Sequence, residues 1–110
     1  MRFVYLINKE GTDEYKIGIG VNPEKRIKTL QTGNGETLIL VNKFCSNFST
    51  KIEVNLHKKY YSTHKHGEWF YLDNKDVNEF TSLCEKYEKS FSYLNQENCF
   101  FKKEIEKLKY

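Results

Sequence analysis

Apolar residues in the first half of the chain alternate with polar ones at spacings that predict two strands and a turn. Residues 2–7, RFVYLI, form a short apolar and aromatic run typical of a buried strand, and the following KEGTDE is polar turn material. Residues 15–20, YKIGIG, alternate strictly between apolar and other residues. Because alternate residues of a strand point to opposite faces, the two runs predict a hairpin whose second strand has one apolar face.

The opposite face of that second strand carries Lys16, Gly18 and Gly20 and is therefore almost bare. Glycine weakens a strand, and its repetition on one face indicates that something approaches the backbone closely. A packed helix, a bulge and a bound ligand all satisfy this condition. The local pattern leaves these alternatives open.

The next segments predict a helix, a strand and a second helix. Residues 23–31 follow a capping Asn22, begin with Pro23 and end before Gly33, which is expected to close the helix in a left-handed conformation. Ile27 and Leu30 should face the sheet. Residues 37–44 predict a third strand and residues 50–60 a second helix, after which the chain should turn at Gly67 into an aromatic segment that closes the core.

Beyond residue 74 the chain has no glycine or proline and follows a heptad repeat. One seam carries Val77, Cys84, Phe91, Asn98 and Ile105, and the other carries Phe80, Tyr87, Leu94, Phe101 and Leu108. The single Asn98 favours a parallel two-stranded pairing, in which Glu97 and Glu104 would meet Lys102 and Lys109 of a second copy. The alternative is a long helix that folds back onto its own domain.

Composition and charge exclude some classes without selecting a function. The chain has 110 residues, a net charge of +3 and no apolar run or leader-like pattern typical of a membrane span or signal peptide, so a cytoplasmic protein without membrane contact is expected. Three cysteines without metal-type spacing indicate reduced thiols.

In order along the chain, the pieces FVYLI, YKIG, NPEKRIKTLQTG, IEVNLHKKY and HGEWFYL resemble the GIY-YIG nuclease superfamily, in particular its short phage and bacterial branch. The resemblance spans about residues 1–72. The resemblance implies that Tyr5 and Arg26 match the functional tyrosine and arginine of the superfamily, and that Glu53 matches the glutamate that holds a divalent metal. Phe3 and Lys16 depart from the name-giving motifs, standing where a glycine and a tyrosine are expected, and some restriction-type members resemble this chain in the lysine.

Hydrolysis of a phosphodiester requires an activated water and stabilisation of the charge on the phosphoryl oxygens. Arg26 has a planar donor group that matches a phosphate, and Glu53 could hold one Mg²⁺ or Mn²⁺ ion. Tyr5 could orient the attacking water, Lys16 could lower the pKa of Tyr5 or contact the phosphate, and His57, one turn after Glu53, could accept a proton. Gly18 and Gly20 would leave room for the first helix and the nucleic acid.

Each of these residues also has an ordinary structural interpretation. Tyr5 could be a core tyrosine, Arg26 a solvated charge and His57 a hydrogen-bonded structural residue. Glu53 follows Thr50 at the spacing of a capping box, so its carboxylate could instead bond the start of its own helix.

The sequence therefore predicts an α+β fold with a small antiparallel three-stranded sheet flanked by helices in residues 1–73, and a C-terminal helix in residues 74–110 that forms a parallel coiled coil. The resemblance implies a metal-dependent endonuclease that cuts DNA with one ion per site, compatible with a phage-encoded protein acting in a host cell. The expected nucleic-acid contacts are Lys25, Lys28 and Lys58, and the expected partners are DNA and a second copy of the chain. The alternative is a decayed, non-cleaving adaptor. The hydrolytic interpretation requires that Glu53 does not lie on the far side of the sheet from Tyr5 and Arg26.

Overall fold

The computed structural model describes the backbone of residues 2–109 and the side chains of residues 2–94. Its centre is an antiparallel five-stranded sheet in the order β3-β1-β2-β5-β4. The strands are β1 (Arg2–Lys9), β2 (Glu14–Gly20), β3 (Leu38–Ser46), β4 (His64–His66) and β5 (Trp69–Tyr71). The helices are α1 (Pro23–Thr32), α2 (Ser49–Lys59), the 3-10 turn η1 (Tyr61–Thr63), α3 (Asn74–Asn78) and α4 (Phe80–Lys109).

The α+β class is confirmed, but the expectation of three strands is wrong. Residues 64–71, which the sequence predicted only as a turn and an aromatic segment, form the two short strands β4 and β5 around Gly67 (φ +54°). They extend the sheet beyond β2, with β5 pairing residues Glu14 to Lys16 of β2. This addition places residues just before β5 next to the predicted site.

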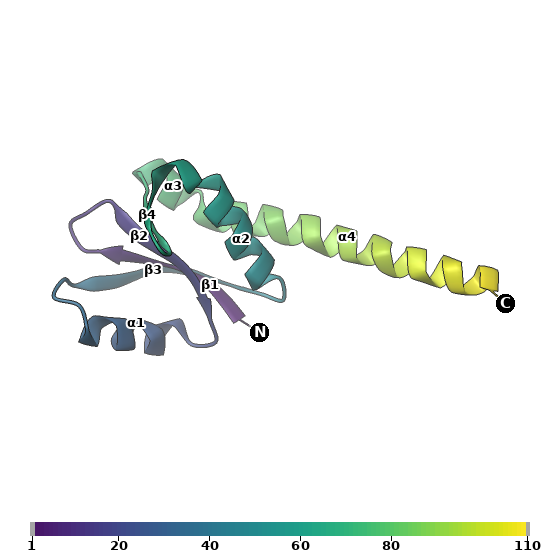
Figure 1. Cartoon of the computed structure of the whole chain (residues 1–110), viewed down its shortest axis with the longest axis horizontal. Coiled ribbons are helices and arrows are strands. Elements are labelled where there is room, and N and C mark those ends of the chain that lie inside the picture. The colour runs from purple at the N-terminus through teal and green to yellow at the C-terminus, as the bar shows by residue number, and fades with distance from the viewer. Residues whose placement is uncertain (1, 110) are drawn as a thin grey trace.

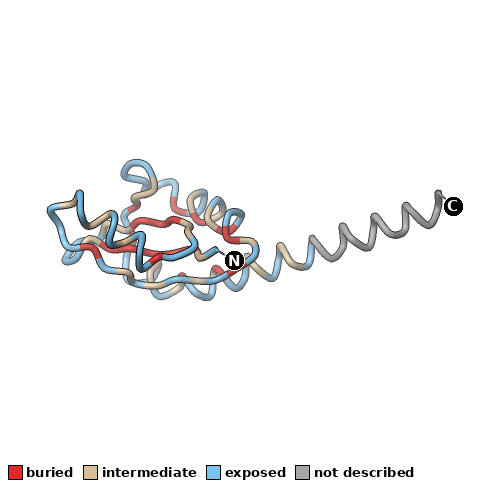
Figure 2. The backbone as a smooth tube through the Cα atoms, turned by 90° about the horizontal axis from the view of Figure 1, so that it is seen from below, coloured by how far each residue is buried: buried red, intermediate tan, exposed pale blue. Residues whose placement is uncertain are grey.

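Helices cover both faces of the sheet, as Figure 1 shows. On one face α1 packs over Tyr5, Ile7 and Leu38, with Ile27 and Leu30 directed inward as predicted. On the other face α2 and the first part of α4 cover the larger core, which includes Val4, Leu6, Ile17, Ile52, Leu56, Phe70 and Phe80. In Figure 2 the buried positions lie within this sheet-and-helix part of the chain.

The first helix begins as the sequence predicted and ends differently. Asn22 Oδ1 accepts a hydrogen bond from the Lys25 amide at 3.1 Å, and Pro23 occupies the first turn. Gly33 follows the helix with φ −97°, so the prediction of a left-handed glycine there is wrong. The positive φ angles among described residues fall instead at Gly11 and Gly67, in the two tight turns between paired strands.

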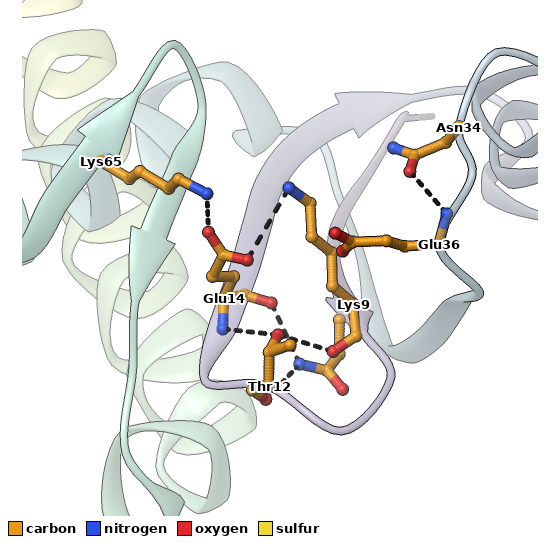
Figure 3. Close-up of polar contacts among 7 residues, drawn as sticks. Lys9, Thr12, Glu14, Asn34, Glu36 and Lys65 are labelled. Atoms are coloured by element: carbon orange, nitrogen blue, oxygen red, sulfur yellow. Dashed lines mark hydrogen bonds and ion pairs between the residues drawn. The ribbon is translucent and has the colours of Figure 1, made fainter.

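Polar contacts fix the β1–β2 hairpin against β4, as Figure 3 shows. The Glu14 carboxylate lies between the ammonium groups of Lys9 and Lys65. The hydroxyl of Thr12 donates to the Lys9 carbonyl at 2.7 Å and accepts from the Glu14 amide at 3.1 Å. These contacts stabilise the start of β2, with which β5 pairs.

The first half of the heptad seam packs on its own domain. Phe80 and Cys84 are buried in the larger core, and Val77, Tyr87 and Phe91 pack against it. For these residues the interpretation of a helix folding back is confirmed, and they are not available as a coiled-coil seam. Burial raises the pKa of the Cys84 thiol to about 12.

The later part of α4 extends past the sheet (Figure 1). Leu94 is 53% exposed. The seam residues Asn98, Phe101, Ile105 and Leu108, and their flanking charges, lie outside the residues whose side chains are described. No helix in the described part of the chain combines the length and apolar character needed to cross a membrane.

Candidate nuclease site

Tyr5 lies on the face of the sheet that α1 covers, between Gly18 of β2 and Lys43 of β3. Its side chain is 2% exposed, so it is a core residue as well as a candidate for chemistry. A Cβ atom at Gly18 would lie 2.6 Å from the Tyr5 hydroxyl oxygen and 2.7 Å from Cζ. A Cβ atom at Gly20 would lie 3.7 Å from the ring.

At Gly18 the bare face of YKIGIG therefore accommodates the Tyr5 phenol, an occupant that the sequence did not predict. Room for a nucleic acid along this face stays a prediction. Only glycine leaves the space that the ring occupies at position 18. This packing fixes the Tyr5 hydroxyl over Gly18 of β2, the strand that also carries Lys16.

Lys16 shares this face of β2 and is almost buried, with 9% of its surface exposed. Its ammonium lies 2.8 Å from Glu68 Oε2 and 5.9 Å from the centroid of the Trp69 ring. The contacts follow from the pairing of Lys16 with Trp69 across β2 and β5. Glu68 was not predicted as a site residue, and only its position beside Trp69 could have indicated it, once β5 was known to pair with β2.

His57 occupies the point where the pairing of β2 with β5 ends, while β1 still pairs along the other edge of β2. The Ile17 amide donates to the Glu68 carbonyl at 3.1 Å, and the Ile17 carbonyl oxygen lies 2.9 Å from His57 Nε2. Because a carbonyl only accepts, Nε2 carries the hydrogen, and Nδ1 is the nitrogen left for chemistry. The ring also packs against Phe70 at 4.9 Å between centroids. His57 is therefore a hydrogen-bonded structural residue through Nε2, as one interpretation of the sequence held, and its Nδ1 remains for chemistry.

Glu53 lies one turn before His57 on α2, and its capping interpretation is wrong. The helix begins at Ser49 after Phe48, without a side-chain cap. The Glu53 Oε2 atom is buried and has no hydrogen-bond partner. Burial and then the Glu68 carboxylate raise the pKa of Glu53, while His57 and Lys16 oppose the shift. The Glu53 carboxylate therefore lies within electrostatic reach of the Lys16–Glu68 pair.

The helices α1 and α2 lie on opposite faces of the sheet (Figure 1). Glu53 nevertheless lies within electrostatic reach of Lys16, which belongs to the Tyr5 face, because β5 stops pairing with β2 at Lys16 and leaves that edge of β2 uncovered. The two faces thus meet around the edge of β2. The ion pair and the electrostatic interactions of Glu53 group Lys16, Glu68, Glu53 and His57 at this edge. The helix that carries Glu53 covers the opposite face from Tyr5 and α1, so the condition set for the hydrolytic interpretation is not met by a shared face and requires a substrate that reaches around the edge of β2.

Arg26 is not joined to this cluster by any contact. It is exposed on α1, as are Lys25 and Lys28, and its guanidinium makes no hydrogen bond or ion pair with the described residues. An ion pair between Glu24 and Lys43 fixes the first turn of α1 against β3. Lys58 is exposed on α2, beyond His57. The assignments of these four cationic residues remain predictions.

The available side chains fit a metal site with a single protein carboxylate better than one with several protein ligands. Among the described residues no group of three or more His, Cys, Asp or Glu side chains could hold a metal. One buried carboxylate oxygen without a partner, Glu53 Oε2, suits Mg²⁺, which uses one or two carboxylates and completes its shell with water and phosphate oxygens.

Comparison with known proteins supports the resemblance at the level of the family. The T5orf172 domain matches residues 2–85, from the first strand into the buried start of α4. Searches of curated proteins and of solved structures found no match. The chain therefore belongs to the T5orf172 domain family, within the clan of GIY-YIG nuclease-like domains.

Proposed function

We propose that the protein is a metal-dependent endonuclease that hydrolyses phosphodiester bonds in DNA. The observation that carries the proposal is the buried, unpartnered Oε2 of Glu53 beside Lys16 and His57, in a chain of the GIY-YIG nuclease-like clan. An ionisable oxygen without a partner costs folding free energy, so its presence at the edge of a sheet calls for a ligand.

Glu53 would hold one Mg²⁺ or Mn²⁺ ion. Such an ion stabilises charge on phosphoryl oxygens and makes a bound water more acidic. Tyr5 orients the attacking water through its hydroxyl, which its buried ring holds in place. Lys16 exchanges Glu68 for a phosphate oxygen, and His57 accepts a proton at Nδ1 because Nε2 is engaged. Arg26 reaches a phosphate from α1, with Lys25 and Lys28 on the same helix.

A non-cleaving adaptor is the second candidate, and the Lys16–Glu68 ion pair favours it. At 2.8 Å this pair neutralises the cation that would otherwise contact a phosphate. Together with the isolation of Arg26, it is what a domain that binds nucleic acid without cutting it would show. Cleavage assays separate the two functions directly.

We further propose that two copies pair through the C-terminal part of α4. The two strands of a duplex run in opposite directions, so cutting both requires attack on two backbones of opposite polarity. Since each chain has one small site, a homodimer is a simple solution. The seam residues that follow Phe91 are the ones left for this contact, since the earlier ones pack on their own domain.

The test is incubation of supercoiled and linear DNA with Mg²⁺ or Mn²⁺, comparing the wild type with Glu53→Gln and Arg26→Ala. Glu36→Gln is the matched control, since Glu36 is exposed in the loop before β3. Loss of cleavage in the first two variants and its retention in the control would support the endonuclease. DNA binding by the wild type with no cleavage under either metal would favour the adaptor.

A further inference from the structure

The outer side of α2 carries a hollow beside the candidate site. Val54, His57, Lys58 and Tyr61 line it, at spacings that place them along one stripe of the helix and the following turn. Its volume is about 520 Å³, within the roughly 300–1,000 Å³ typical of ligand sites. Val54 is 43% exposed and Tyr61 is 75% exposed, so large apolar surfaces face solvent here.

The aromatic part of this hollow is held in place by its neighbours. The Tyr61 ring lies parallel to the His64 imidazole, with 6.3 Å between centroids and 4° between planes. His64 is fixed in turn, because its Nε2 lies 2.8 Å from the Gly67 carbonyl oxygen and its ring packs on Phe70 at 5.2 Å. Tyr61 thus presents a flat face that needs no rearrangement to receive a second ring.

The lining of the hollow is complementary to a nucleotide. It combines an exposed phenol and an aliphatic side chain with the ammonium of Lys58, and no carboxylate is among the lining residues. Nucleobases stack on tyrosine whatever their sequence, and lysine attracts the adjoining phosphates. An apolar peptide segment would use the Val54 and Tyr61 surfaces but would gain nothing from Lys58.

His57 connects the hollow to the candidate site. Its ring lines the hollow, its Nε2 bonds the edge of β2, and it lies one turn after Glu53 on α2. A strand whose base stacks on Tyr61 and whose phosphate passes Lys58 can therefore present the next phosphate near the Glu53 carboxylate. Bases in a paired duplex are already stacked and cannot enter such a hollow.

We propose that this hollow binds an unpaired nucleobase, so that the substrate is DNA with single-stranded or unpaired nucleotides next to the cleaved bond. Cleavage next to the bound base depends on the proposed endonuclease function, whereas binding of the base depends on the hollow alone.

The experiment measures binding by fluorescence anisotropy in EDTA, which keeps cleavage out of the readout. The probes are a labelled single strand, its matching duplex, and that duplex with a central unpaired loop. We expect Tyr61→Ala to weaken binding of the single strand and the looped duplex about tenfold and to leave binding of the plain duplex unchanged. Tyr61→Trp should retain the affinity, because it keeps a stacking face.

Tyr71→Ala is the matched control, since Tyr71 is an exposed tyrosine of β5 on the other face of the sheet. Melting temperatures equal to that of the wild type would show that both alanine variants are folded. The proposal is overturned if Tyr61→Ala binds the single strand as the wild type does, if it weakens all three probes equally, or if Tyr71→Ala has the same effect.

The two proposals fail in different ways. Cleavage by the wild type, with unchanged binding by Tyr61→Ala, would remove the base site and leave the endonuclease intact. Absence of cleavage with either metal, together with selective loss of single-strand binding in Tyr61→Ala, would remove the endonuclease and confirm the base site.

Discussion

Gly18 faces the Tyr5 ring across the β1–β2 pair, and a methyl group added at Gly18 would overlap the phenol, at 2.6 Å from its oxygen. The ring is buried and cannot swing away, so we expect Gly18→Ala to lower the free energy of unfolding by about 1–3 kcal/mol. Urea denaturation measures this change. Gly33→Ala is the control, because nothing lies within 4 Å of a Cβ there and its φ is negative.

A double-mutant cycle assigns the cost of Gly18→Ala to Tyr5. In a Tyr5→Leu background the same alanine should cost clearly less, since the shorter side chain leaves the space open. An equal cost in both backgrounds would show that a contact other than the one with Tyr5 opposes alanine at position 18.

Glu53 supports a second prediction at this scale, on stability and pH. Burial and Glu68 raise its pKa in the folded protein. A carboxyl with a raised pKa contributes its full stability only below its unfolded pKa of about 4, and this contribution is lost as the pH rises through the folded value. At neutral pH the ionised Glu53 therefore lowers stability, and Glu53→Gln should melt at a higher temperature than the wild type in EDTA.

Thermal melts across pH, with and without Mg²⁺, test this expectation. The advantage of Glu53→Gln should shrink as the pH falls toward 4, and Mg²⁺ should raise the melting temperature of the wild type and leave that of Glu53→Gln unchanged. Glu36→Gln should follow the wild type throughout. A lower melting temperature for Glu53→Gln at neutral pH would mean that the carboxylate stabilises the fold.

Among the secondary-structure elements, the sequence predicted those whose patterns are local. The starts of β1, β2, α1 and α2 follow from alternation, caps and helical spacing, and the structure places each within a residue or two of the expectation. Two elements of three residues, β4 and β5, carry too few positions for a periodic signal, and they exist because Trp69 and its neighbours pair with β2.

The same distinction explains which site residues were predictable. Alternation along β2 predicted the face of Lys16, and the resemblance to the GIY-YIG superfamily indicated Tyr5, which the hairpin pairing in the structure places on that same face. Glu68 joins them only through the pairing of β5, which no short-range pattern of the sequence indicates. The heptad repeat was ambiguous for a related reason, because an apolar seam looks alike whether it meets a second chain or the chain's own sheet.

In the whole molecule, α1 and α2 lie on opposite faces of one sheet, so their charged groups can cooperate only around the edge of β2. The short β5 leaves that edge open from Ile17 onward, and His57 takes the place of a strand partner there. Substrate bound at this edge could contact both faces. The grouped side chains come from β2, from α2 and from the turn before β5, so Arg26 on α1 would join them only through a substrate that spans this edge.

The division of α4 between core and tail leads to a prediction about truncation. A chain ending at Lys75 lacks Phe80 and Cys84, which are buried, and should fail to fold, since removing even one large core side chain costs about 3–5 kcal/mol. A chain ending at Leu94 keeps all the packed residues of α4 among the described side chains. It should therefore melt close to the full-length protein.

Sedimentation of the same proteins tests the proposed dimer separately from folding. The full-length chain should sediment as a dimer and the chain ending at Leu94 as a monomer, because the truncation removes the seam positions Asn98, Phe101, Ile105 and Leu108 while leaving the domain core. Phe101→Lys in the full chain should also give a monomer, since it places a charge in the seam. A monomeric full-length protein would exclude pairing through α4, and a dimeric chain ending at Leu94 would locate the contact on the domain itself.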